Sequence, residues 1–314
     1  MKTNIPERIA ALREAMRQQK VDAYIIPSSD PHLSEYPADR WKSREWISGF
    51  TGSAGTIVVT ADKAGLWTDS RYFLQAASQL EGSGIELYKL ALPETPSITE
   101  FLLHELHAGQ AVGLDGQTYS AAEASALANK LNRKEIKLDT SADLIEGIWK
   151  DRPAVPGNPI FEMPEALSGA SVHEKLDLIN NQLRSEGADC LILAALDEIA
   201  WTFNIRGTDV TYNPVVVSYA FVSEDESVLF IKPEKLTAEI TEHLKKEGVT
   251  LAEYSMIQRY LSRLPENSRV FVDMNKTNVS LYDAIPGSCT IVEGISPANH
   301  LKSIKNETEI KGFQ

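Results

Sequence analysis

The sequence predicts two tandem α/β domains, each with a mixed sheet and helices on both faces, because one pattern of elements occurs twice. When Asp22 is aligned with Asp189, an amphipathic helix and a strand coincide in the two halves. The helix of each copy carries apolar residues at i, i+3 and i+7, the spacing of a face that packs on a core. These residues are Ile9, Leu12 and Met16 in the first copy, and Leu176, Ile179 and Leu183 in the second.

The strand after each helix is an unbroken apolar run, at 23–26 in the first copy and at 190–193 in the second. Such a run is typical of a strand that is covered on both faces. Strands and helices then mix within each copy, which indicates an α/β layer arrangement. The length of 314 residues also favours about two domains.

The remaining elements are expected in the same order in both copies. In the first copy we expect a helix at 44–47, strands at 56–59 and 65–68, a helix at 70–80, a strand at 85–90, a helix at 98–107 and a strand at 111–114. In the second copy we expect strands at 215–222 and 227–231, a helix at 236–246, a strand at 249–254, a helix at 255–264 and a strand at 269–272.

Three helix starts carry a capping-box pattern, in which a polar side chain accepts an N–H and a Glu three residues on reaches back. The pairs are Asn4 with Glu7, Ser171 with Glu174, and Asn306 with Glu309. The first two begin equivalent helices. The third begins a helix whose apolar stripe starts with Ile310 and Phe313.

The copies differ after the strand, where the first copy carries an insertion rich in turn formers, within "PHLSEYPADRWKS". Between the copies, the segment "KDRPAVPGNPIFEMPEALSGAS" is rich in Pro and predicts a stiffened linker. We therefore expect a first domain at 1–150, a linker at 151–170, a second domain at 171–302, and the start of a further helix at 303–314.

The composition is that of a globular protein, with 43% hydrophobic and 24% charged residues. The net charge of −13 argues against a nucleic-acid or anionic-membrane partner, because phosphate binding needs clustered cations. Two cysteines are too few for a disulfide framework, and Cys190 lies in an apolar run, which predicts a buried thiol in a reducing compartment. Since the sequence shows neither a signal peptide nor an apolar run of roughly 20 residues, we expect a cytoplasmic protein.

The glycine-rich segment "GFTGSAG" at 49–55 has the composition of a phosphate-binding loop. A dinucleotide-binding loop follows a strand and opens a helix, so that the helix N-terminus faces the pyrophosphate. Here the order is reversed, because a helix precedes the glycines and a strand follows them. We therefore interpret the segment as a glycine turn with positive φ.

The segment "HELH" raises the question of a metal site at His104 and His107. The zincin pattern needs two His four positions apart on one helix face, whereas these two are three apart. The other histidines are scattered, and no cysteine cluster is present. We predict a solvated helix face here and no metal site in this chain.

Arg71 and Tyr72 follow a predicted strand in "WTDSRY" and fall in the first turn of a helix capped by Thr68 or Asp69. A cation is unfavourable at the positive end of a helix dipole, so Arg71 needs an anionic partner. The candidates are an internal carboxylate, Asp69 or Asp30, and a carboxylate of a substrate or a second subunit, since Arg suits bidentate carboxylate binding.

The densest polar cluster contains Asp197, Arg206, Asp209 and Asn213. One interpretation is a structural network of charged hydrogen bonds. The other is a surface that docks a further domain, because Arg206 and Asp209 replace uncharged residues of the first copy. On the second hypothesis, Arg206, Asp209 and Asn213 face the other domain and Asp197 holds the turn from behind.

Several segments together resemble the cytosolic type of Xaa-Pro aminopeptidase, a branch of the creatinase/prolidase family. They are "YIIPSSDPHLSEY", "ISGFTGSAGT", "LWTDSRYFLQAASQL", "ALDEIAWTFNIRGTDVTYNPVVVSYAFV" and "LKSIKNETEIKGF". The N-terminal domains of this family have a ribonuclease-H-like α/β fold, and the longer type carries two of them before a pita-bread catalytic domain. The resemblance therefore implies a duplicated non-catalytic domain, with 303–314 as the start of the catalytic domain's first helix.

The resemblance implies a parent enzyme that releases the N-terminal residue from peptides with proline second. In the family, two divalent metals, usually manganese, are held by two Asp, a His and two Glu, and this ligand pattern does not occur here. The resemblance thus implies that this chain is inactive and holds no cofactor. Its implied roles are to restrict active-site access to short peptides and to support dimerisation. The implied partners are its own catalytic domain, a second copy and peptides with proline second.

Two alternatives come from other classes of protein. In the first alternative, the chain is a free-standing peptide-binding or scaffold module. In the second, it is a ribonuclease-H-like nuclease. The nuclease would need clustered carboxylates and a basic face, which the net charge of −13 disfavours.

Overall fold

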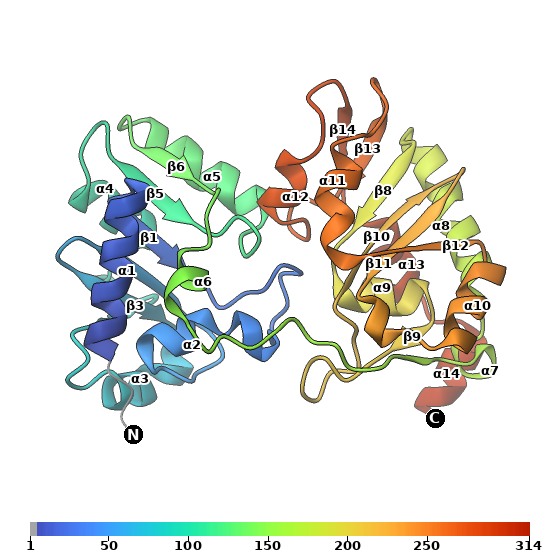
Figure 1. Cartoon of the computed structure of the whole chain (residues 1–314), viewed down its shortest axis with the longest axis horizontal. Coiled ribbons are helices and arrows are strands. Elements are labelled where there is room, and N and C mark those ends of the chain that lie inside the picture. Colours follow the sequence, from blue (N-terminus) through green and yellow to red (C-terminus); the bar gives the residue numbers. More distant parts are fainter. Residues whose placement is uncertain (1–4) are drawn as a thin grey trace. The chain divides into compact units, whose positions relative to one another are not determined.

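The computed structural model of the protein describes residues 5–314, which form two compact units (Figure 1). Unit 1 comprises the described residues through Asp30 together with Glu35–Ala154. Unit 2 comprises Val155–Gln314 and the short segment Pro31–Ser34, which lies within the insertion of the first copy. None of the helices among residues 5–314 combines the length and the apolar character of a membrane span.

The sheet of unit 1 has six strands in the order β4-β3-β2-β1-β5-β6, with β1 in the middle (Figure 1). β1 pairs antiparallel with β2 and parallel with β5, so the sheet is mixed as the sequence predicts. The strands are β1 (Ala23–Ile26), β2 (Thr56–Thr60), β3 (Ala64–Thr68), β4 (Glu86–Lys89), β5 (Ala111–Leu114) and β6 (Lys137–Asp139).

Helices cover both faces of this sheet, because alternate residues of β1 enter two different cores. Tyr24 and Ile26 pack with α1, α2, α3 and α6, whereas Ala23 and Ile25 pack with α4 and α5. This explains why the strand is apolar throughout. The helices are α1 (Ile5–Gln19), α2 (Ser43–Ser48), α3 (Phe73–Gln79), α4 (Ile98–Glu105), α5 (Ala121–Asn132) and α6 (Leu144–Ile148), with 3₁₀ turns η1 (Asp39–Trp41) and η2 (Ser70–Tyr72).

Unit 2 repeats this topology strand for strand. Its sheet has the order β12-β11-β10-β8-β13-β14, and its central strand β8 again pairs antiparallel on one side and parallel on the other. The duplication predicted from the sequence is therefore confirmed by the topology. The strands are β8 (Cys190–Leu193), β10 (Ser218–Ser223), β11 (Ser227–Ile231), β12 (Val249–Ala252), β13 (Arg269–Val272) and β14 (Thr290–Glu293).

The helices of unit 2 also divide between two cores. α8, α9, α10 and α13 contribute to one core, and α11 and α12 contribute to the other. The helices are α7 (Glu165–Ser168), α8 (Val172–Glu186), α9 (Leu196–Thr202), α10 (Ala238–Lys246), α11 (Ile257–Leu261), α12 (Val279–Asp283), α13 (Pro297–Ser303) and α14 (Glu307–Phe313), with 3₁₀ turns η3 (Pro233–Lys235) and η4 (Tyr254–Met256).

The expected helix starts are found where the structure describes them. The predicted stripes of α1 and α8 are buried, and complete capping boxes begin α8 at Ser171 and α14 at Asn306. The third capping box depends on Asn4, which lies outside the described residues. Two expected helices, 70–80 and 255–264, each begin as a 3₁₀ turn before the α-helix.

The expected linker at 151–170 differs from the structure, because most of it packs against unit 2. Ile160 is buried in a core of that unit, and β7 (Phe161–Glu162) pairs with β9 (Ile205–Arg206). By contrast, Arg152 donates a 3.0 Å hydrogen bond to the carbonyl of Arg40 and belongs to unit 1. Apart from the short segment Pro31–Ser34, the change from unit 1 to unit 2 therefore falls between Ala154 and Val155.

Candidate functional site

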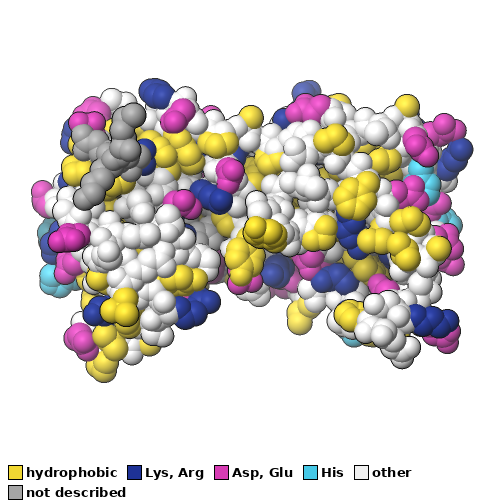
Figure 2. Space-filling model, turned by 90° about the horizontal axis from the view of Figure 1, so that it is seen from below, with side chains coloured by type: hydrophobic (Ala, Val, Ile, Leu, Met, Phe, Trp, Pro, Cys, Tyr) yellow, Lys and Arg dark blue, Asp and Glu magenta, His cyan; other side chains and the backbone are white. Residues whose placement is uncertain are grey.

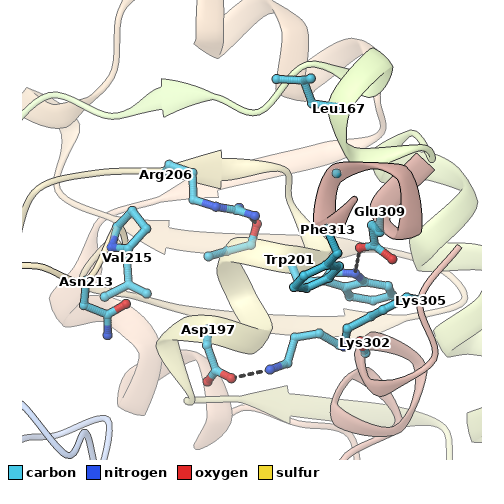
Figure 3. Close-up of a pocket in the computed structure, with 13 residues that line it drawn as sticks. Leu167, Asp197, Trp201, Arg206, Asn213, Val215, Lys302, Lys305, Glu309 and Phe313 are labelled. Atoms are coloured by element: carbon cyan, nitrogen blue, oxygen red, sulfur yellow. Dashed lines mark hydrogen bonds and ion pairs between the residues drawn. The ribbon is translucent and has the colours of Figure 1, made fainter. Parts of the chain in front are cut away.

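A pocket of about 410 Å³ opens on unit 2 and gathers three of the six residues that the sequence singled out (Figure 3). Its walls come from α7, α9, β9, the loop before β10, α13 and α14. The residues that line it are Leu167, Asp197, Ala200, Trp201, Arg206, Asn213, Pro214, Val215, Lys302, Lys305, Glu309, Gly312 and Phe313.

Arg206 reaches the pocket from β9, whose position is fixed by pairing with β7. Its Nη1 donates to the carbonyl oxygens of Ala200, at 2.6 Å, and Ile205, at 2.9 Å. Among residues 5–314, no carboxylate forms an ion pair with this guanidinium. Burial lowers the pKa of Arg206, and the negative charge of Glu309 partly offsets that effect.

Asp197 lies in the first turn of α9 and forms an ion pair with Lys302, at 2.5 Å between Oδ2 and Nζ (Figure 3). Its side chain is 57% exposed. The sequence-based interpretation placed this residue behind the turn, whereas the structure places it on the pocket wall. Its neighbour Glu198 points inward instead, and burial raises the pKa of that carboxyl.

Trp201 connects α9 with α14, because its Nε1 donates a 3.3 Å hydrogen bond to Oε1 of Glu309 (Figure 3). Behind the indole lies Lys175, which is only 1% exposed and has its Nζ 4.7 Å from the ring centroid. This ammonium donates to the Trp201 carbonyl, at 2.9 Å, and to Oδ1 of Asn204, which are both uncharged. Burial lowers the pKa of Lys175 to about 8.

Asp209 does not reach the pocket, although the sequence grouped it with Arg206. Its side chain is 1% exposed and forms an ion pair with Nζ of Lys235, which is fully buried. The same carboxylate accepts a 2.7 Å hydrogen bond from the backbone N–H of Val217. Because this hydrogen bond uses the Val217 N–H, that group is not available to the backbone hydrogen bonds of a longer strand. Accordingly, β10 begins at Ser218, whereas the sequence predicted a start at 215. Asp209 thus anchors the loop from inside the domain.

The loop that Asp209 anchors presents Asn213 to the pocket. A bridge between Val210 and Asn213 closes the loop. Between them, Tyr212 has a φ of 62° and a fully exposed side chain. A bulky residue in this left-handed region is unusual, which indicates that the anchors at both ends fix the loop conformation.

Arg71 and Tyr72 lie on unit 1, so the structure gives them no part in the pocket. Arg71 forms a bidentate ion pair with Asp69, with Nε–Oδ1 and Nη2–Oδ2 distances of 2.9 and 2.8 Å. Of the partners considered from the sequence, the structure contains this internal carboxylate, and the hydrogen bonds from Arg71 lower the pKa of Asp69. Asp69 also caps the η2 turn. Tyr72 contacts the glycine-rich segment through a 2.7 Å hydrogen bond to Ser53.

The glycine-rich segment at 49–55 is held by a buried arginine that the sequence did not single out. Arg44 donates to the carbonyl oxygens of Phe50 and Gly52, so the loop presents its carbonyls, rather than N–H groups, to this side chain. Burial lowers the pKa of Arg44 to about 10. Gly49 has a φ of 73°, which confirms the predicted glycine turn at that position.

Metal ligands are not gathered anywhere in the part of the chain that the structure describes. No group of three or more His, Cys, Asp or Glu side chains could hold an ion among residues 5–314. His104 is exposed and contacts Glu105, whose carboxylate pairs with Lys63. The described residues therefore do not fit a metal centre, and we derive no metal-dependent step from them.

Lys302, Lys305, Glu309 and Phe313 belong to the pocket, although the sequence did not mark them as site residues. They lie about 100 positions after Asp197, too far for any local pattern to join them. The capping box at Asn306 was the one available signal, since it predicted the helix that carries two of them.

The fold and the duplicated topology define the class of protein. Family models for the creatinase/prolidase N-terminal domain match residues 8–148 and, separately, residues 151–309. The chain therefore belongs to the creatinase/prolidase N-terminal domain family and contains two tandem copies of this domain.

Xaa-Pro aminopeptidases are among the similar proteins within this class. The chain is 39% identical to a probable Xaa-Pro aminopeptidase P of Botryotinia fuckeliana, over 99% of this chain and 49% of that protein. It is 38% identical to the corresponding protein of Coprinopsis cinerea, over 98% and 52% respectively. Our chain thus spans about half the length of these curated relatives.

One solved structure superposes on nearly the whole chain. It is the X-prolyl aminopeptidase from Caenorhabditis elegans, described as a cytosolic enzyme with a di-nuclear active site. The TM-score is 0.92 at 28% identity, over 98% of this chain and 52% of that one.

Proposed function

We propose that this chain is the N-terminal, non-catalytic portion of a Xaa-Pro aminopeptidase, a hydrolase that removes the N-terminal residue from peptides with proline second. The observation that carries this proposal is the similarity along nearly the whole chain to about half of each relative. Two family domains account for that half, which leaves the catalytic function to the other half of the longer protein.

On this proposal, the metals lie outside the present chain. The C. elegans enzyme has a di-nuclear active site, whereas the described residues of this chain offer no group that could hold an ion. The full-length protein would bind two divalent ions, manganese in our proposal. The cytoplasmic location that we propose agrees with the cytosolic description of the C. elegans enzyme.

The two domains would restrict access to the active site and support a homodimer. A substrate with proline second would then reach the metals only as a short peptide. The face of the molecule seen in Figure 2 carries acidic and basic side chains in scattered groups, without a continuous basic stripe among the described residues. The net charge of −13 favours a peptide substrate over a nucleic acid.

The experiment compares residues 1–314 with the full-length protein on a peptide with proline second, in the presence of Mn²⁺. We expect turnover by the full-length protein only, and no tightly bound metal in the chain by elemental analysis. Chelator-sensitive turnover, or stoichiometric metal, in residues 1–314 would overturn the non-catalytic assignment. An inactive full-length protein that still binds peptides would instead support a peptide-binding or scaffold module.

A further inference from the structure

The pocket of unit 2 holds more positive charge than its own carboxylates neutralise. Arg206, Lys302 and Lys305 line it, and Lys175 lies directly behind Trp201. Of these four cations, only Lys302 has an ion-pair partner among residues 5–314. Lys305 donates to the backbone carbonyls of Lys302 and Ser303 instead.

The carboxylates of the pocket are already engaged. Asp197 pairs with Lys302, and Glu309 accepts hydrogen bonds from Trp201 Nε1 and from the backbone N–H of Asn306. An excess of positive charge in a protein with a net charge of −13 is a local feature, not a consequence of composition. It favours an occupant that carries a carboxylate.

Apolar side chains extend the same surface beyond the pocket. Leu167 on α7 is 64% exposed, and on α14 Ile310 and Phe313 are 47% and 80% exposed. α7 and α14 pack together, with Asn306 donating a 2.8 Å hydrogen bond to the Ser168 carbonyl. Figure 3 shows Leu167 on α7 across the pocket from Lys302, and Phe313 and Trp201 line the same pocket. Large apolar side chains around a pocket are typical of interaction sites.

The loop before β10 adds an aromatic side chain to this surface. Tyr212 is fully exposed, and its neighbours Asn213, Pro214 and Val215 line the pocket. Because Asp209 fixes the loop from the interior, the tyrosine is held at the surface at little further entropic cost. Tyrosine in such a position is a typical interface anchor.

We infer that the surface formed by α9, α14 and the Tyr212 loop is covered by the other half of the full-length protein. The covering segment places a carboxylate against Arg206 and Lys305, and an apolar side chain against Leu167 and Phe313. This inference rests on the proposed function, which supplies the covering half. It is argued from the unbalanced charge of the pocket and from the length of the relatives, of which this chain spans about half.

The test compares amide hydrogen exchange of residues 1–314 with that of the full-length protein. We expect amides at 200–215, which lie far from the chain end, to exchange at least about tenfold more slowly in the full-length protein, because covering a surface suppresses local opening. α10, which contributes nothing to the pocket, is the internal reference and should exchange equally in both. Equal exchange of the pocket segments in both proteins would overturn the inference.

Charge variants of the full-length protein test whether the covering segment places a carboxylate against Arg206 and Lys305. Arg206→Gln and Lys305→Gln should each reduce the protection of α14 by roughly threefold or more, and 0.5 M NaCl should do the same in the wild type. Arg259→Gln is the matched control, since that side chain is exposed and makes no ion pair with the described residues. Because Lys305 is exposed and bonds only to neighbouring carbonyls, its variant remains informative if Arg206→Gln lowers the stability of the fold. Unchanged protection of α14 in both charge variants would contradict the proposal that a carboxylate of the covering segment contacts Arg206 and Lys305.

The outcome is separable from that of the proposed function. Turnover of a peptide with proline second, combined with an unprotected pocket, would leave the function standing and reject the covered surface. A protected pocket without turnover would support the covered surface and reject the proposed function.

Discussion

Two buried lysines of unit 2 differ in the kind of group that faces them. Lys235 meets the carboxylate of Asp209, whereas Lys175 meets a carbonyl, an amide oxygen and the face of Trp201. Burial lowers the pKa of both ammonium groups, and in Lys235 the ion pair opposes the shift. The Asp209–Lys235 ion pair fixes a loop, whereas Lys175, which has no carboxylate partner among the described residues, lies beneath the pocket. The two lysines therefore respond differently to substitution.

Substitution of Lys235 should be severe. Lys235→Met leaves the Asp209 carboxylate buried without its cation, and breaking one side of a buried pair costs about 3–5 kcal/mol in the free energy of unfolding. Chemical denaturation of residues 1–314 measures this cost. Lys246→Met is the control, because Lys246 forms an exposed pair with Glu242, and such pairs contribute about 0–1 kcal/mol. Equal effects of the two substitutions would contradict the structural role of the Asp209–Lys235 pair.

The stability of unit 2 should rise with pH because of Lys175. Its pKa is about 8 in the folded chain against an ordinary 10.5, so between these values the unfolded chain binds more protons than the native one. The free energy of unfolding therefore gains up to about 1.4 kcal/mol per pH unit in that window, and the gain fades over about one pH unit below pH 8. Lys175→Met should remove this gain, as denaturation from pH 7 to 10.5 would show. Parallel pH profiles for wild type and variant would refute the assignment.

Among the elements, the glycine-rich segment of unit 1 depends on close packing as well as on backbone freedom. A Cβ added to Gly52 would lie 2.3 Å from Phe50 Cζ and 2.7 Å from Tyr72 Cδ1. Phe50 is fully buried, and Arg44 and Tyr72 hold the segment from two sides. The absence of a side chain at Gly52 thus allows the aromatic rings to pack against the loop.

Gly52→Ala should lower the free energy of unfolding by about 1–3 kcal/mol, the usual cost of overpacking. Gly147→Ala is the matched control, because a Cβ there meets no atom within 4 Å and the residue lies in α6. That control should be neutral or stabilising by about 0.5–1 kcal/mol. Thermal unfolding of the two variants measures the difference between them. If Gly52→Ala unfolds at the same temperature as the wild type, the rings of Phe50 and Tyr72 can move apart to accept the Cβ.

Local patterns predicted most elements of the fold, but they could not predict the pocket. The buried stripes of α1 and α8 and the unbroken strands β1 and β8 follow from spacing and burial. The expected strand at 215–222 was too long, because a distant carboxylate takes one of its N–H groups. The grouping of Arg206 with Asp209 likewise failed, since Lys235 competes for that carboxylate across the fold. Long-range contacts of this kind leave no periodic signal in a sequence.

For the whole molecule, the accessible connection between the units is shorter than the proline-rich segment. Residues 151–158 lie outside helices and strands, whereas Ile160 is buried and β7 is paired. Limited proteolysis should therefore cut first within 151–158 and leave two folded fragments. Mass spectrometry of the first products locates the cut. First cleavage inside either six-stranded sheet would show that the units do not resist unfolding independently.

The shared strand order has a consequence for synthesis on the ribosome. In each unit the first strand to emerge, β1 or β8, becomes the centre of the sheet, and each later strand of that sheet pairs with one already made. β2 and β3 extend the sheet to one side and β4 completes that edge, before β5 and β6 extend the other. Within these two six-stranded sheets, each strand after the first therefore finds its partner already translated. Because each sheet grows outward from its central strand during translation, its edge strands stay unpaired only briefly. Unit 1 is also translated, and can fold, before unit 2.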